Sequence, residues 1–324
     1  MLKDSVLSSN DSLDTNLLHL DSMDCHIDGS TLETSDLPPV LLKNALRSVQ
    51  VMLDANNSVV QVGLSRFIPR RGLSTTGIRV QGGRLILSNS EIWSGAGSEN
   101  ANGISAVQSA KIEMIGSTLY GDAHARTAVL LRLDGSDLLV KGGIFQLAAE
   151  SGVYGILATG GHLDLADAEI RCAAVRDFVA LISADQSQLS VRGIRVSGGD
   201  SPDFRVAVIR GGTSSWKANT IRIDPAQSVQ GSGIFNFSGI GQNEFEGNTF
   251  TGNTQSTLFY LGSSDSTLTI RNNILERWRF LLQETPQNLV RQSDRDKGVS
   301  TIQELERLDR QGSLFEGNKV RQGL

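Results

Sequence analysis

The chain is poor in cysteine and proline and contains no long hydrophobic run. Its two cysteines among 324 residues, Cys25 and Cys172, are too few for a disulfide framework or a cysteine-based zinc site, and their positions leave open whether they pair. Six prolines beside 34 glycines fit a protein with many tight turns, but not a collagen-like or low-complexity chain.

Charge and hydropathy exclude further classes of protein. No segment approaches the roughly 18 consecutive apolar residues of a membrane-spanning helix. Residues Met1 to Ser5 contain neither a basic region nor an apolar stretch, so we expect no signal peptide in this chain. The net charge of -5 gives no electrostatic reason to expect nucleic acid or an anionic membrane as a partner. With 39% hydrophobic and 20% charged residues, the chain can nevertheless bury a continuous core.

The strongest signal in the sequence is an internal repeat of about 26 residues. Segments that begin with a small or apolar residue recur at this spacing, and their first residues are Gly77, Gly103, Val129, Gly155, Leu181, Val208, Ile234 and Phe259. Each unit also carries an apolar pair, then a small or amide residue and another apolar residue, as at Leu85, Leu87, Ser90 and Ile92. Period-two alternation over such short stretches is typical of strands. Each unit therefore predicts about three short strands and no helix.

Two repeat folds compete for this pattern. Leucine-rich repeats share the Leu-x-Leu-x-x-Asn-x-Leu spacing, and their period of about 20–29 residues includes this one. Their consensus requires a leucine three residues before the apolar pair, where this sequence has residues such as Gly82, Ser109 and Gly135. The parallel β-helix is therefore favoured, and the horseshoe of leucine-rich repeats is the alternative.

The recurring pattern Gly-Ile-x-x-x-Gly/Ser-x-x-Leu-x-Leu-x-x-Asn/Ser-x-Ile resembles that of the right-handed parallel β-helix superfamily of pectate-lyase-like proteins, over about residues 50–280. The resemblance is to the coil and specifies no member of the superfamily. It implies an all-β solenoid and permits polysaccharide binding or cleavage.

Equivalent residues of such a solenoid stack about 4.8 Å apart. We therefore expect one inward ladder of apolar residues and, at a sharp turn, ladders of Ser90 on Ser117 and of Asn248 on Asn273. The expected apolar ladder is Ile78, Ile104, Leu130, Ile156 and Ile182.

The two ends of the chain depart from the repeat. Residues 1–50 break the period, and the segment Leu37 to Val40 contains two prolines, which cannot donate the hydrogen bonds of a strand. Residues 1–50 are therefore predicted to form an N-terminal cap and an irregular first coil. Residues 51–324 form the predicted β-helix, including an insertion at 282–312 after which Phe315 to Asn318 copy Phe245 to Asn248.

The insertion contains a helix signature. Ser300 followed by Gln303 is typical of a capping box, and Gly312 can end the helix. Ile302, Leu305 and Leu308 fall on one helical face. The sequence therefore predicts a short amphipathic helix over residues 300–310 that packs on the solenoid.

The motifs of catalytic β-helix enzymes are not found. The Asn-x-Asp, Asp-Asp and Gly-His-Gly motifs of polygalacturonase-like hydrolases do not occur, and we expect His162, which follows two glycines, to be an outward strand residue. The segment Arg66 to Arg71 approaches the Arg-x-Pro-x-x-Arg motif of pectate lyases, but Pro69 stands one position late, so we expect a solvated turn.

Asp122, His124 and Arg126 are the best acid, base and cation cluster in the chain, but they are weak catalytic candidates. Strand-like alternation would point all three to one side, and a neighbouring carboxylate could raise the histidine pKa towards that of a general base. The segment lies in a linker between coils, however, and linkers are normally polar. The four histidines, His19, His26, His124 and His162, show no paired spacing, so we expect no metal and no cofactor.

A candidate ligand surface emerges from the residue that follows the last apolar position of each unit. The series is Trp93, Tyr120, Gln146, Arg171, Ser197, Asp224, Thr251 and Glu276. If the apolar residues point inwards, their successors point outwards. Two aromatic rings, an amide and a guanidinium in line suit a glycan, so Trp93, Tyr120, Gln146 and Arg171 are the predicted binding residues. The alternative is that Trp93 and Tyr120 simply stack on each other as a cross-strand pair.

Two functions fit these observations. The first is a non-catalytic β-helix scaffold, extracellular, on a cell surface or periplasmic, that binds glycan or a protein partner along its outer face. The second is a polysaccharide lyase or glycoside hydrolase of the pectin-lyase-like fold. The missing motifs favour the first.

Overall fold

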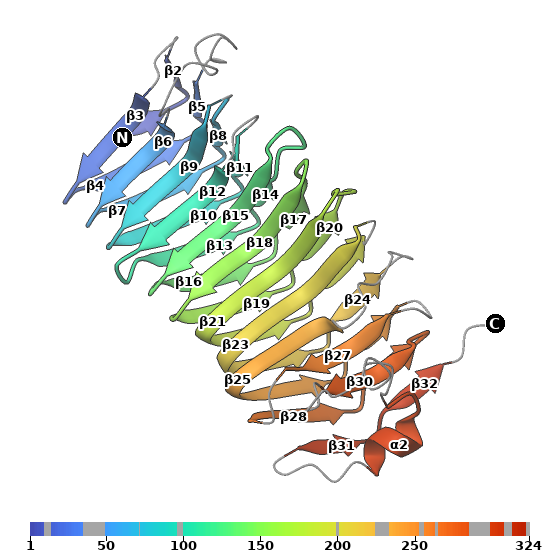
Figure 1. Cartoon of the computed structure of the whole chain (residues 1–324). Helices are drawn as coiled ribbons and strands as arrows, with labels where there is room; N and C mark the ends of the chain where they lie inside the picture. The colour runs from blue at the N-terminus through green and yellow to red at the C-terminus, as the bar shows by residue number, and fades with distance from the viewer. Residues whose placement is uncertain are drawn as a thin grey trace.

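The computed structural model describes residues 1–9, 14–34, 49–70, 72–95, 100–198, 201–223, 233–252, 256–262, 265–284, 299–307 and 313–321. These residues form a parallel β-solenoid that runs from the blue N-terminal end to the red C-terminal end (Figure 1). Each coil contributes a first, a second and a third strand, and equivalent strands of successive coils pair in parallel. The predicted parallel β-helix is confirmed, and the horseshoe with helices on its outer face is not formed.

The first strands build one face of the solenoid. They are β3 (Asp14–Asp21), β6 (Val49–Asn56), β9 (Ser74–Gln81), β12 (Asn100–Val107), β15 (Thr127–Asp134), β18 (Gly152–Thr159), β27 (Thr257–Leu261) and β30 (Phe280–Glu284). In three neighbouring coils the first and second strands are continuous, as β21 (Phe178–Arg192), β23 (Asp203–Lys217) and β25 (Gly233–Glu246).

The second strands build the next face. They are β1 (Leu2–Lys3), β4 (Asp24–Asp28), β7 (Val59–Gly63), β10 (Arg84–Ser88), β13 (Lys111–Ile115), β16 (Asp137–Lys141), β19 (His162–Ala166), β28 (Ser266–Arg271) and β31 (Leu314–Glu316), together with the second halves of β21, β23 and β25.

The third strands form a separate 12-stranded sheet. They are β2 (Val6–Ser9), β5 (Thr31–Thr34), β8 (Arg66–Ile68), β11 (Glu91–Trp93), β14 (Thr118–Tyr120), β17 (Ile144–Leu147), β20 (Glu169–Cys172), β22 (Arg195–Gly198), β24 (Thr220–Ile223), β26 (Thr249–Thr251), β29 (Ile274–Glu276) and β32 (Lys319–Arg321).

The core is a stack of inward ladders, one of which differs from prediction by one residue. Ile78 pairs with Ile104 and Ile156 with Ile182, but Leu131 rather than Leu130 lies between Ile104 and Ile156. The backbone of Leu130 lies against Gly103, where an added Cβ would come within 2.6 Å of the Leu130 carbonyl oxygen. Both leucines are fully buried, so hydrophobicity alone did not distinguish them.

The two polar ladders lie at the corner between second and third strands. The backbone N–H of Ser90 donates to Ser117 Oγ at 3.2 Å. The N–H of Asn248 donates to Asn273 Oδ1 at 2.9 Å, and the N–H of Asn219 donates to Asn248 Oδ1 at the same distance. Both predicted stacks are confirmed, and Asn219 extends the asparagine ladder by a further coil.

The solenoid begins within the segment predicted as a cap. Strands β1, β2 and β3 pair in register with β4, β5 and β6, so the described residues from 2 to 34 continue the three faces. The predicted interruption at Leu37 to Val40 lies outside the described residues.

The C-terminal insertion carries the predicted helix in shorter form. Strand β30 pairs with β27, so the coil continues to residue 284 rather than ending at 282. Helix α2 (Ile302–Glu306) starts two residues later than predicted, and its N-cap is Thr301 rather than Ser300, with Glu304 as the capping-box partner. Hydrogen bonds from the backbone N–H groups of Ser300 and Thr301 lower the pKa of Glu304. Leu305 is fully buried against the core and Ile302 partly so, whereas Leu308 and Gly312 lie outside the described residues.

The two cysteines are unpaired. Cys25 and Cys172 both have free thiols, and burial raises the pKa of the Cys172 thiol far above its usual range. Among the described residues, no helix has the length and apolar character needed to cross a membrane.

Candidate functional site

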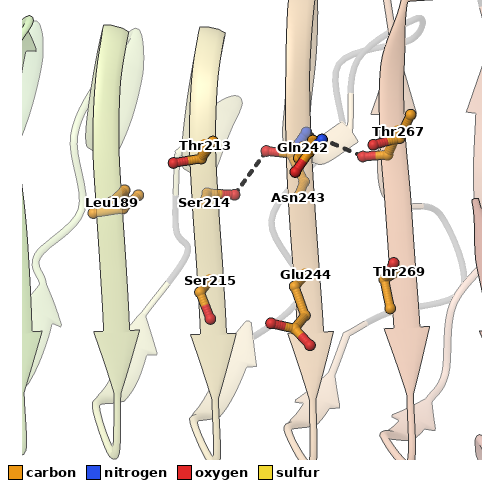
Figure 2. A pocket seen from close by; sticks show the side chains of 9 residues that line it. All are labelled: Leu189, Thr213, Ser214, Ser215, Gln242, Asn243, Glu244, Thr267 and Thr269. Carbon is orange, nitrogen blue, oxygen red and sulfur yellow. Dashed lines mark hydrogen bonds between the residues drawn. The ribbon is translucent and has the colours of Figure 1, made fainter. Parts of the chain in front are cut away.

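A polar hollow of about 500 Å³ lies over the second strands of four neighbouring coils. Figure 2 shows its lining, which comes from β21, β23, β25 and β28. The lining residues are Leu189, Thr213, Ser214, Ser215, Gln242, Asn243, Glu244, Thr267 and Thr269. None of these residues is aromatic, so any ligand held here is recognised chiefly by hydrogen bonds.

The strand register places the outward side chains in two rows along the solenoid axis. Thr213, Gln242 and Thr267 are paired neighbours in one row. Ser215, Glu244 and Thr269 are paired neighbours in the other. Adjacent strands lie about 4.8 Å apart, so each row offers a polar group at nearly every step along the axis.

Two buried polar residues form the floor of the hollow. Ser214 and Asn243 are each 4% exposed, and Ser214 Oγ donates to Asn243 Oδ1 at 2.7 Å. On the neighbouring coils the same inward positions carry Leu189 and Leu268. The asparagine amide also donates to the Thr267 carbonyl oxygen at 3.4 Å, so the floor is held by hydrogen bonds rather than by a leucine ladder.

One carboxylate lines the hollow and is fixed by two cations. Arg271 lies 2.8 Å and Lys217 3.4 Å from the carboxylate of Glu244, and Lys217 also contacts Glu246 at 3.3 Å. Burial acts to raise the Glu244 pKa, but the hydrogen bonds from Arg271 and Lys217 outweigh it and hold the pKa below its usual value. The two carboxylates, Glu244 and Glu246, and the two cations, Lys217 and Arg271, sum to zero net charge at this edge.

The predicted column of outward residues is formed on the sheet of third strands. Trp93 pairs with Tyr120, Tyr120 with Gln146, and Gln146 with Arg171, as the sequence predicts. Beyond Ser197 the register brings Arg222 into the column, whereas the predicted Asp224 lies outside the described residues. Arg66 and Phe67 of β8 pair with Glu91 and Ile92, so this register, continued by one residue, places Ile68 before Trp93 in the column, an apolar neighbour that the sequence reasoning missed.

The side chains of this column interact mainly with one another and with their own sheet. The rings of Trp93 and Tyr120 lie 4.0 Å apart at an angle of 48°, so they do not form one flat platform. Arg171 donates two hydrogen bonds of 2.8 Å to Glu169, which lower the pKa of Glu169 and raise that of Arg171.

The cluster of Asp122, His124 and Arg126 does not have the alternating geometry expected for it. The segment is a turn, in which Asp122 Oδ1 accepts the backbone N–H of His124 at 2.8 Å and lies 3.1 Å from its Nδ1. The buried Ala125 separates this pair from Arg126. Asp122 and His124 are therefore brought together chiefly as a turn-stabilising pair.

The remaining sequence candidates are structural. His162 is an exposed strand residue whose Nδ1 lies 3.2 Å from Asp137 Oδ1, as expected for an outward position. Arg66 lies in β8, paired with Glu91 at 2.8 Å, so this part of the segment predicted as a turn is a strand. Within the described ranges, no group of three or more His, Cys, Asp or Glu side chains is placed to hold a metal ion.

Comparison with known proteins supplies no family for the chain. No protein-family model matches the sequence, and no curated protein matches it. The parallel β-solenoid is shown by the structure alone.

The sequence reasoning missed the residues of the hollow, although a signal for them was present. The outward positions of β23, β25 and β28 read Thr-x-Ser, Gln-x-Glu and Thr-x-Thr in consecutive coils. An alignment of the outward positions of the second strands, coil by coil, displays these rows.

Proposed function

We propose that this protein is a non-catalytic β-solenoid scaffold that binds a polysaccharide along its outer face, in an extracellular, cell-surface or periplasmic setting. The observation that carries the proposal is the hollow on the second strands, with its two rows of hydroxyl, amide and carboxylate groups. A polymer that carries hydroxyl groups at regular intervals can hydrogen-bond to successive coils.

The chemistry of the lining supports a sugar ligand. Threonine and serine hydroxyls both donate and accept, as sugar hydroxyls do, and the Gln242 amide offers both functions as well. The ionised Glu244 adds a strong acceptor, since hydrogen bonds to charged groups are the stronger class. The balance of charge around Glu244 favours a neutral polysaccharide over an acidic one. Because these side chains project from paired strands, little backbone ordering is needed when a ligand binds.

The state of Glu244 supports binding rather than catalysis. Glycoside hydrolysis generally uses two carboxyl groups, one of which has a raised pKa and donates a proton. The pKa of Glu244 is lowered, and the nearby Glu246 shares the same lysine partner. The Glu244 carboxylate is thus suited to accept hydrogen bonds and poorly suited to supply a proton.

The column of Trp93, Tyr120, Gln146 and Arg171 remains a second candidate contact for glycan. It lies on the sheet of third strands and on earlier coils than the hollow. A ligand in the hollow therefore does not lie along the column as well, and the two surfaces are testable separately.

Affinity electrophoresis of the full chain against a panel of neutral and acidic polysaccharides tests the proposal. We expect retardation by at least one neutral polysaccharide, with no increase in ultraviolet absorbance or reducing ends on prolonged incubation. Appearance of unsaturated products or new reducing ends would establish a lyase or hydrolase instead. Absence of retardation across the panel would refute the proposed binding function.

A further inference from the structure

Strand β25 contains one more residue than its neighbour at the corner between first and second strands. Arg210 pairs with Ser238 and Gly212 pairs with Gly241, so Gly211 alone faces the two residues Gly239 and Ile240. In the preceding pair of coils, Asp185 pairs with Arg210 and Ser187 with Gly212, with one residue between them on each strand. An extra residue of this kind changes the direction of a side chain and is often found beside functional sites.

The side chain of the extra residue is held out in solvent. Ile240 is 78% exposed, the highest value after Met1 among the large hydrophobic residues that the structure describes. Its neighbours Gly239 and Gly241 lie against the backbone of β23, because an added Cβ would come within 3.3 Å of Gly211 N and 2.8 Å of Gly212 O respectively. The corner is therefore built from closely packed backbone, and Ile240 stands on it without flanking side chains from Gly239 or Gly241.

The position of this isoleucine, which we call the rim of the hollow, follows from its neighbours in sequence and strand register. Gln242 follows Ile240 by two residues, and Gly212, which pairs with Gly241, directly precedes Thr213. Two residues of extended chain span about 7 Å. The apolar side chain and the row of Thr213, Gln242 and Thr267 can therefore contact neighbouring parts of one ligand.

We propose that Ile240 is a specificity-determining contact that packs on the C–H face of a sugar ring whose hydroxyl groups bond to Gln242 and Thr213. The inference rests on the proposed polysaccharide-binding function and adds that the ligand is built from pyranose rings with an apolar C–H face. A pyranose ring presents an apolar C–H face beside its hydroxyl groups, whereas a chain that is polar on every side gains nothing from an isoleucine. The inserted residue thus supplies the exposed aliphatic contact that the two outward rows of the hollow lack.

Two variants of the full chain test this role on the neutral polysaccharide retained most strongly by the wild type. Ile240→Ser removes the apolar group, and deletion of Ile240 restores the one-residue corner of the preceding coils. We expect each to bind about fivefold more weakly with an unchanged Tm, as for partial burial of one aliphatic side chain. Leu64→Ser is the matched control, because Leu64 is 68% exposed at a corner of a distant coil, and it should bind as the wild type does.

The outcomes separate this inference from the function on which it rests. Ser215→Trp, which fills the hollow, supplies the reference for a blocked site. If Ser215→Trp abolishes binding but Ile240→Ser binds as tightly as the wild type, the role of Ile240 is refuted and the binding site stands. If the wild type binds no polysaccharide, the proposed function and the role of Ile240 are both refuted. If Leu64→Ser weakens binding as much as Ile240→Ser does, the effect is not specific to the rim and the inference fails.

Discussion

The N-terminal and C-terminal halves of the solenoid build the same coil from different chemistry. Serines stack at the corner before the third strands in the N-terminal half, at Ser30, Ser65, Ser90 and Ser117. Asparagines occupy the equivalent corner in the C-terminal half, at Asn219, Asn248, Asn273 and Asn318. Between them Gly143, Ala168 and Ile194 hold the position without a polar side chain. The backbone therefore makes the same corner with serine, with asparagine or with no polar side chain at this position.

The two ladders differ in what they connect. Ser90 Oγ donates to the carbonyl of Ser88 in its own coil at 3.0 Å. Asn248 Nδ2 instead donates to the carbonyl of Trp216 in the preceding coil at 2.8 Å, while its Oδ1 accepts from Asn219. Both ladders accept an N–H across coils, but only the asparagine side chain also donates across coils. At this corner, therefore, each asparagine side chain makes more hydrogen bonds between coils than each serine side chain does.

The interiors of the two halves also differ. The N-terminal coils bury mainly aliphatic side chains, with Phe67 and Phe145 as isolated buried rings. In the C-terminal half, Phe245 lies at the centre of an aromatic cluster with Trp216, Phe235, Phe237, Phe250 and Phe259. Ala207 stands between Ile182 and Phe235 in the ladder, and its small side chain leaves room for the T-shaped pair of Trp216 and Phe235. The hollow and the Ile240 corner lie on these heavily connected coils, as expected where a binding site needs a rigid support.

The largest expected effect comes from removing the central aromatic ring. Phe245→Ala should destabilise the fold by about 3–5 kcal/mol, because it leaves a large cavity among packed rings. Val140→Ala, in the same inward ladder of the aliphatic half, should cost about 2 kcal/mol or less since fewer buried atoms are lost. Urea unfolding of both variants measures the difference. Equal losses of stability would show that the aromatic cluster adds nothing beyond an ordinary apolar core.

The next effect distinguishes the two ladders. Asn248→Ala should cost about 3 kcal/mol, because the buried Asn219 N–H loses its acceptor and the Trp216 carbonyl loses the donor from the next coil. Ser90→Ala should cost about 1 kcal/mol, because only the Ser65 N–H loses its acceptor. Thermal and urea unfolding of the two variants provide the test. A larger loss for Ser90→Ala than for Asn248→Ala would reverse the proposed order of the two halves.

A smaller, pH-dependent effect is expected at Glu244, which lines the hollow. Because the folded-state pKa of Glu244 is lowered, its contribution to stability is present above the usual glutamate value of about 4.3 and is lost as pH falls through the folded value. Glu244→Gln should therefore reduce the loss of stability between about pH 5 and pH 3. Unfolding curves of both proteins at a series of pH values measure this slope. Identical slopes would mean that Glu244 is not held in its ionised form by Arg271 and Lys217.

The smallest expected effect concerns the aromatic pair of the N-terminal half. If the column binds glycan, Trp93→Ala should weaken retention by about fivefold, since an aromatic contact contributes on the order of 1 kcal/mol. The fold should be little affected because Trp93 lies on the outer surface of β11. Affinity electrophoresis of this variant beside Ser215→Trp compares the column with the hollow. Unchanged retention would leave Trp93 and Tyr120 as a cross-strand pair and place binding in the C-terminal half.

Much of the fold was predictable from sequence because every coil of a solenoid repeats the same short strands and corners. Period-two alternation and the 26-residue step are visible in single units, and the corner positions of Ser90 and Asn248 follow from their place after an apolar pair. The exact register was harder to predict where two neighbours are both buried and apolar, as with Leu130 and Leu131. In the same way, the sequence allows two capping boxes, one of Ser300 with Gln303 and one of Thr301 with Glu304. The structure contains the second.

The candidate site was less predictable because it depends on properties that cross coils. The hollow lies where polar Ser214 and Asn243 occupy inward positions that carry leucines on the neighbouring coils, and where polar outward side chains coincide on neighbouring strands. Ile240 is exposed because β25 has one more residue than β23 at this corner. The length of the repeat already varies from coil to coil, so one extra residue is not noticeable in the sequence. Local patterns identify the strands, but the stacking of their outward faces determines the site.

The most direct test of the binding site compares two substitutions on the same face of the solenoid. Ser215→Trp places a large ring in the hollow of the C-terminal half, whereas Ser88→Trp adds the same ring to β10 in the N-terminal half. The measurement is the affinity of each full-length variant for the neutral polysaccharide that the wild type retains. Ser215→Trp should lower the affinity by at least about tenfold, or about 1.4 kcal/mol, while Ser88→Trp leaves it unchanged. Wild-type affinity in Ser215→Trp, or an equal loss in both variants, would contradict the assignment of the hollow as the binding site.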